Sequence, residues 1–99
     1  MPYVMRMIRS FRDRRTAVVF TGATPKGFPA DLVAAARRKL RLVHAAARIE
    51  DLRSPPGNRL EALRGDRAGQ HSIRVNDQWR VCFRWDGADA HEVEIVDYH

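Results

Sequence analysis

The sequence predicts a single α+β domain in which two helices precede an antiparallel sheet. Three observations lead to this prediction: the length of 99 residues, a change of hydrophobic period along the chain, and the turn-forming segments between periodic stretches. A chain of this length buries one small core, so we expect residues 1–99 to form one domain. Helical spacing comes first and strand alternation follows, which is the order of an α+β fold.

The first half of the chain is expected to contain two helices. Asp13 can cap a short helix that ends near Phe20, where Gly22 allows a left-handed turn. A glycine- and proline-rich loop follows, and the second helix runs from Ala30 to about Ile49. Its apolar residues recur at spacings of three and four and form one stripe that faces the core: Leu32, Ala36, Leu40, Val43 and Ala47.

Basic residues follow the same spacing on a neighbouring line of this helix: Arg37, Arg41, His44 and Arg48. Such a line is either a solvated helix face or a docking surface for a polyanion or an acidic partner. The segment Ser54-Pro55-Pro56-Gly57 ends all helical structure, because the first proline disfavours helical geometry at the serine.

The second half of the chain alternates apolar and polar residues, which predicts antiparallel strands. These strands are expected at Arg59–Leu63, Gln70–Val75, Trp79–Trp85 and His91–Tyr98, with an edge strand at Ile8–Phe11 that can extend back to Tyr3. A three-residue loop that pairs Val75 with Trp79 keeps the apolar side chains on one face. The same register pairs Ile73 with Val81. We therefore expect a sheet of four to five strands.

The charge is the most informative part of the composition, because the net value is +6 and sixteen of the 18 cations are arginine. Guanidinium groups match phosphate oxygens, although a GC-rich genome produces the same bias. The three-residue loop also places Arg74 across from Arg80, and such like-charge pairs are unfavourable without an anion. Either the sheet face away from the helices binds RNA phosphates, or Arg74 and Arg84 extend into water or pair with Glu92 or Glu94. The candidate phosphate-binding residues are Arg64, Arg67, Arg74 and Arg84.

Two titratable residues are candidates for proton transfer. His99 directly follows an apolar strand, and Asp97 and the terminal carboxylate favour a protonated imidazole, which suits a general acid. A terminal histidine is otherwise a frayed end. Glu61 is the candidate base that takes a proton from a ribose 2′-hydroxyl, and its spacing fits equally well a strand glutamate paired with Arg59 or Arg64.

The sequence suggests no metal centre and no cofactor, since its Asp, Glu and His residues lack the spacing of a Mg²⁺ or Zn²⁺ site. The single cysteine, Cys82, excludes an internal disulfide and is expected to be a small strand residue rather than a catalytic thiol. RNA cleavage would then use attack of the 2′-hydroxyl on its own phosphate, with arginines stabilising the charge. No stretch resembles a membrane span or a secretory signal, so we expect a cytoplasmic protein.

The run from Asn58 to Phe83, which includes Leu60-Glu61-Ala62-Leu63-Arg64 and Asn76-Asp77-Gln78-Trp79-Arg80, resembles the signature of HigB-type toxins of the RelE/ParE superfamily. The ending Asp97-Tyr98-His99 is similar to that family's usual terminus. The resemblance covers the chain from Met7, which makes residues 1–6 a candidate N-terminal extension. It implies a RelE-like fold and a ribosome-dependent endoribonuclease that cleaves messenger RNA.

The resemblance also implies partners and residue roles. A HigA-like antitoxin with a helix-turn-helix domain would neutralise the toxin, and the pair would bind operator DNA through the antitoxin. By position, Arg80 resembles the phosphate-clamping arginine and Arg64 a neighbouring basic residue that is more often lysine. The active-site terminus corresponds to Asp97, Tyr98 and His99.

Two positions depart from the family pattern. Glu61 replaces a histidine found in some members and is similar to the glutamate base of YoeB-type toxins, whereas His71 stands where most members have an aromatic residue. Two alternatives stay open: a ParE-type toxin that acts on DNA gyrase, and a module that binds only as a corepressor. Glu61, Arg80 and His99 together favour the nuclease, since a gyrase binder needs none of them.

Overall fold

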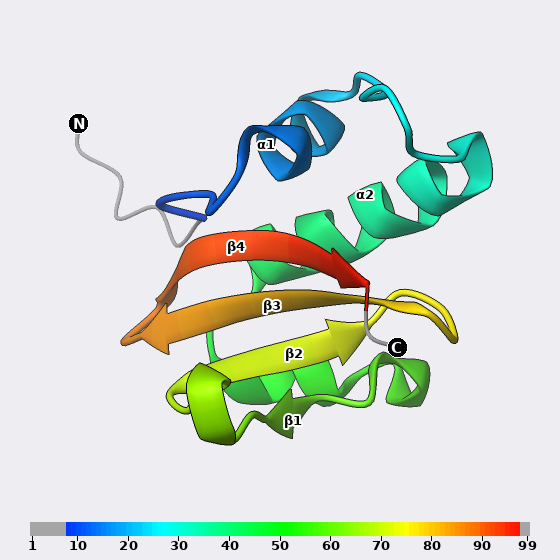
Figure 1. Ribbon diagram of the computed structural model, residues 1–99. Coiled ribbons are helices and arrows are strands. Elements are labelled where there is room, and N and C mark those ends of the chain that lie inside the picture. Colours follow the sequence, from blue (N-terminus) through cyan, green and yellow to red (C-terminus); the bar gives the residue numbers. More distant parts are fainter. Residues whose placement is uncertain (1–7, 98–99) are drawn as a thin grey trace, which may run out of the picture.

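The computed structural model describes residues 8–97, in which two α-helices cover one face of a four-stranded antiparallel sheet (Figure 1). The elements are α1 (Arg14–Thr21), α2 (Ala30–Ala45), η1 (Ile49–Arg53), η2 (Pro56–Asn58), β1 (Glu61–Ala62), η3 (Gly65–Arg67), β2 (Gln70–Arg74), β3 (Trp79–Asp86) and β4 (Asp89–Asp97), where η denotes a short 3₁₀ helix. The strands follow chain order across the sheet. The predicted α+β class is confirmed.

Helix α1 has the two ends that its sequence predicts. The Asp13 carboxylate accepts a hydrogen bond of 2.8 Å from the Thr16 backbone N–H, and Gly22 closes the helix with a φ of 107°. On the buried side, the Thr16 hydroxyl accepts a hydrogen bond of 3.0 Å from the Ile95 N–H. This contact joins α1 to β4, the strand that leads to the C-terminus.

Helix α2 ends at Ala45, four residues before the predicted end near Ile49. The prediction was wrong because the Asp51 carboxylate accepts hydrogen bonds from the N–H groups of Ala47 and Arg48, at 2.9 and 3.1 Å. These bonds start η1 and leave the backbone extended at Ala46. Ala46 is buried where the predicted stripe had Ala47.

The basic line along the second helix consists partly of structural contacts. Arg37 donates to the carbonyl oxygens of Val19 and Ala23 at 2.9 and 3.1 Å, which satisfies carbonyls at the end of α1. His44 accepts a hydrogen bond of 3.2 Å from the Ile8 N–H through Nδ1. Both residues therefore make structural contacts within the chain and are not freely solvated.

The central hairpin has the predicted register. Ile73 pairs with Val81 and Arg74 with Arg80, and the Val75 N–H donates to the Trp79 carbonyl oxygen at 2.9 Å. The three residues of the loop are thus 76–78. The helices pack on the face that carries Ile73 and Val81, which are fully buried.

The outer strands differ from their predicted bounds. Strand β1 has two residues instead of five, since the left-handed backbone of Arg59, with a φ of 46°, prevents an earlier start. The predicted edge strand at Ile8–Phe11 is reduced to two isolated parallel bridges of its end residues to β4. The proposed extension back to Tyr3 and residues 1–6 lie outside the described residues. No helix within residues 8–97 is long and apolar enough to cross a membrane.

Candidate active site

Arg80, at the start of β3, is held in one position by groups on both sides. Its Nε donates to the Ser72 hydroxyl and its Nη2 to the Arg59 carbonyl oxygen, each at 2.7 Å. Arg59 has a left-handed backbone conformation where its carbonyl oxygen accepts this hydrogen bond from Arg80. The Arg80 side chain is only 13% exposed. A guanidinium fixed in this way is suited to hold a phosphate without reorganising.

Glu61 lies beside Arg80 at the edge of the sheet. One of its carboxylate oxygens, Oε1, is 3.9 Å from Arg80 Nη2, and the side chain is 54% exposed. Glu61 pairs with Ser72 in the register of β1 and β2, so the two residues project to the same side of the sheet. The predicted base and the predicted phosphate clamp are therefore brought together, and the carboxylate is open to a substrate.

The last strand, β4, ends beside the start of β3, which carries Arg80. Val96 lies opposite Arg80 and Asp97 opposite Trp79, while the Gln78 amide donates to Asp97 Oδ2 at 3.0 Å. The register thus brings Asp97 to the same end of the sheet as Arg80, on the face of Trp79, which alternates with Arg80 along β3. The other two predicted residues of the terminus, Tyr98 and His99, lie outside the described residues.

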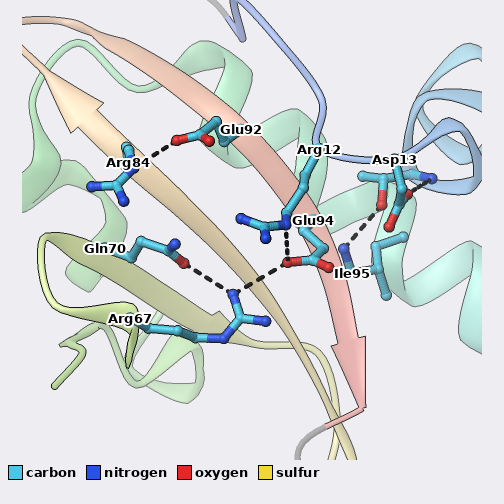
Figure 2. Close-up of polar contacts among 9 residues, drawn as sticks. Arg12, Asp13, Arg67, Gln70, Arg84, Glu92, Glu94 and Ile95 are labelled. Atoms are coloured by element: carbon cyan, nitrogen blue, oxygen red, sulfur yellow. Dashed lines mark hydrogen bonds and ion pairs between the residues drawn. The ribbon is translucent and has the colours of Figure 1, made fainter. Parts of the chain in front are cut away.

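The remaining predicted arginines do not form an open cationic surface. Arg84 Nε is 2.6 Å from Glu92 Oε2, as in the alternative in which it pairs with a glutamate. Arg67 Nη1 donates to Gln70 at 3.0 Å and to Glu94 at 3.2 Å (Figure 2). In this structure these two guanidinium groups are engaged by carboxylates, with which a phosphate would have to compete.

The other two arginines of this group differ from each other. Arg74 is paired with Asp77, an acid within its own hairpin loop that the sequence reasoning did not consider. Arg64 is exposed, and no ion pair joins it to an acid among residues 8–97. Of the four predicted phosphate-binding residues, Arg64 is the one that no carboxylate within the described range neutralises.

Cys82 lies at the centre of the sheet face that carries Arg80. The pKa of its thiol is raised to about 11, mainly by burial, while Arg67 and Arg80 act to lower the pKa and Glu94 and Glu61 to raise it. A thiol of this kind is uncharged at neutral pH and is a poor nucleophile. Within residues 8–97, no group of three or more His, Cys, Asp or Glu side chains is arranged to hold a metal ion.

Sequence reasoning missed two parts of the site. The first is Ser72, which orients Arg80 and could have been found from the register, because it lies diagonally across the hairpin on the same face. The second is a cleft of about 550 Å³ beside Glu61. No sequence signal marks it, since its walls come from η1, η2, the edge strand β1 and its neighbour β2. They are Ile49, Glu50, Arg53, Pro56, Arg59, Leu60, Glu61, Ala62 and His71.

Comparison with known proteins places this chain in a family. The model of a family described as RelE-like toxin of type II toxin-antitoxin system HigB matches residues 9–99. The chain is 49% identical to Toxin HigB-1 of Vibrio cholerae over 57 residues, which are 58% of this chain and 60% of that toxin. This match spans less than two thirds of the Vibrio toxin's length.

Two further relatives cover more of the chain. Endoribonuclease HigB of Proteus vulgaris is 32% identical over 93 residues, which are 94% of this chain and all of that protein. An uncharacterised protein of Haemophilus influenzae is 36% identical over 74 residues, 75% of this chain and 73% of its own length. Because the family model spans nearly all of the sequence, the chain belongs to the HigB-like family of RelE-like toxins of type II toxin-antitoxin systems.

Proposed function

We propose that this chain is an endoribonuclease that cleaves messenger RNA on the ribosome without a metal ion, and that Arg80 and Glu61 are at the centre of its active site. The observation that carries the proposal is the fixed guanidinium with an exposed carboxylate 3.9 Å away. The name of the full-length Proteus relative, an endoribonuclease, supports the reaction class.

The reaction needs a base, an acid and a cationic group. The 2′-oxygen attacks the adjacent phosphorus and gives its proton to Glu61, while the bond from phosphorus to the 5′-oxygen breaks. The leaving 5′-oxygen takes a proton from His99, and the products are a 2′,3′-cyclic phosphate and a 5′-hydroxyl. Arg80 neutralises the charge that builds on the phosphate oxygens. Arg64, Asp97 and Tyr98 complete the proposed site.

The proposed partners follow from the family. Membership of a type II toxin-antitoxin family implies an antitoxin. We propose that this antitoxin is HigA-like, carries a helix-turn-helix domain and connects the pair to operator DNA. In this proposal the protein acts in the cytoplasm, where ribosomes and messenger RNA are available.

The test is cleavage of a defined messenger bound to ribosomes, with a matched messenger that carries 2′-deoxy sugar at the mapped cleavage position. The natural messenger should be cut to a 2′,3′-cyclic phosphate end, and the 2′-deoxy messenger should stay intact at that position. Intact RNA in both cases at equimolar toxin would favour a ParE-type toxin or a pure binding module. Cleavage of the deoxy site would eliminate the 2′-hydroxyl mechanism.

A further inference from the structure

We propose that the cleft beside Glu61 is a nucleobase subsite that favours bases with an exocyclic amino group over uracil. The inference rests on the proposed ribonuclease function and concerns its sequence preference. The cleft has a volume of about 550 Å³, within the range of roughly 300–1,000 Å³ that is usual for small-ligand sites.

The position of the cleft fits a base next to the scissile phosphate. Residues 59–62 line the cleft and also border the active site. The Arg59 carbonyl oxygen accepts a hydrogen bond from Arg80, and Glu61 lies beside the same guanidinium. A nucleotide with its phosphate at Arg80 can place its base across this edge of the sheet. Single-stranded RNA is recognised through such splayed bases.

The lining of the cleft suits a flat aromatic ring. Leu60, Pro56 and Ile49 supply apolar walls. His71 stacks against Phe83, with ring centroids 6.3 Å apart and an angle of 25°, so its ring is held by packing. The His71 Nδ1 atom is buried and has no hydrogen-bond partner in the described part of the chain. No contact of this atom there determines which of the two ring nitrogens carries the proton.

The charged residues of the lining supply the selectivity. The Arg53 and Arg59 side chains have no acidic partner among residues 8–97, and guanidinium planes stack on bases. The Glu50 carboxylate only accepts hydrogen bonds when it is ionised. Cytosine, adenine and guanine offer it an amino group, whereas uracil offers one N–H between two carbonyl oxygens that repel a carboxylate. Glu50 is therefore the residue that discriminates.

The first experiment measures cleavage by the full chain on ribosomes programmed with messengers that differ only in the base 3′ or 5′ to the cleaved bond. Cytosine should be preferred over uracil at one of these positions by roughly tenfold, the value of one charged hydrogen bond to a base. Glu50→Gln should remove most of this ratio, because the amide can also donate to a uracil carbonyl. The matched control is Asp86→Asn, an exposed carboxylate at the far end of β3, which should keep the wild-type ratio.

The second experiment does not depend on cleavage. Cytidine and uridine 5′-monophosphates are titrated into the ¹⁵N-labelled full chain. The amide signals of Glu50, Arg53 and His71 should shift at lower concentration with the cytidine nucleotide. Ala62→Phe, which fills the cleft, should abolish these shifts, and its amide spectrum shows whether the fold is kept.

The outcomes separate the subsite from the nuclease. The subsite is overturned, and the nuclease is left intact, if three results are found together. The wild type cleaves RNA, Glu50→Gln keeps the wild-type base ratio, and no amide signals shift at the cleft. Nucleotide shifts at the cleft without any RNA cleavage would overturn the nuclease and support the cleft as a nucleotide site.

Discussion

At the scale of single residues, the site depends on the way in which Arg80 is held. Its contacts with the Ser72 hydroxyl and the Arg59 carbonyl consume two donors and leave the charge in a fixed position next to Glu61. A flexible cation would lose conformational entropy on binding a phosphate, whereas this one has lost it on folding. Ser72 is thus a positioning residue, although it need not touch RNA.

Replacing Arg80 should affect cleavage more than the fold. We expect Arg80→Lys to lower single-turnover cleavage by roughly 10²- to 10³-fold, since a lysine keeps the charge and cannot hold both contacts. Ser72→Ala should have a smaller effect in the same direction and serves as the control for positioning. Unchanged cleavage in Arg80→Lys, with its fold verified by circular dichroism, would remove Arg80 from the mechanism.

The buried thiol of Cys82 predicts how stability depends on pH. Burial raises its pKa to about 11, above the ordinary value of 9.0, so the unfolded chain loses the proton first. The free energy of unfolding should therefore be full below about pH 9 and fall as the pH rises toward 11, by on the order of 2 kcal/mol.

The measurement for Cys82 is urea unfolding across this alkaline range, with Cys82→Ala as the control. The alanine variant should lose less stability than the wild type between the two pH values. If both proteins lose the same amount, the decline comes from other groups.

At the scale of elements, one polar network joins three segments that are far apart in sequence. Glu94 on β4 lies 3.2 Å from Arg67 in η3 and 3.8 Å from Arg12, which precedes α1 (Figure 2). The Glu94 side chain is 19% exposed, so its loss leaves Arg67 without its carboxylate in a partly buried place. The network fixes the loop between β1 and β2, which carries Arg64.

Removing this carboxylate should loosen that loop. We expect Glu94→Gln to lower the free energy of unfolding by roughly 1–2 kcal/mol and to speed hydrogen exchange in η3. Asp77→Asn, which removes the exposed partner of Arg74, is the matched control and should have a smaller effect, because water screens that ion pair. Equal effects of both changes in denaturant unfolding would show that the network adds nothing beyond a surface ion pair.

The elements also show what a sequence can and cannot predict. The register of β2 and β3 followed from alternation, because a shift by one residue would turn Ile73 away from the core. The end of α2 could not be predicted from alternation or spacing, since it depends on hydrogen bonds to the Asp51 side chain. The sequence did not decide whether Arg84 pairs with a glutamate, because the sheet has a bulge between Cys82 and Arg84. The bulge changes which β4 residue lies opposite Arg84, and Glu92 has a positive φ of 53° there.

The candidate site was predictable to a similar degree. Glu61 and Arg80 meet because the register of three strands brings them to one face, and this register is encoded locally. The cleft was not predictable, because it forms where η1 packs near the edge of the sheet, and that packing depends on the whole fold. Local patterns therefore predict the proposed catalytic pair, whereas the cleft proposed as a subsite depends on tertiary packing.

At the scale of the whole molecule, a net charge of +6 is distributed over a fold whose sheet face is largely neutralised by internal pairs. The cations without acidic partners in the described residues include Arg38 and Arg41 on α2 and Arg53 and Arg59 near the cleft. The cations on α2 are thus separate from those near the proposed active site, and we predict that toxicity and antitoxin binding depend on different surfaces of the molecule.

This separation predicts the behaviour of active-site variants in cells. His99→Ala and Arg80→Ala should each relieve growth arrest, because they remove the proposed acid and the phosphate clamp. Both variants should still co-purify with the antitoxin and repress the shared promoter with it. The measurement is colony formation after induction, alongside pull-down of the tagged antitoxin and a promoter reporter. Full toxicity of the double variant would eliminate the proposed chemistry, and loss of antitoxin binding in a folded variant would mean that the antitoxin covers the active site.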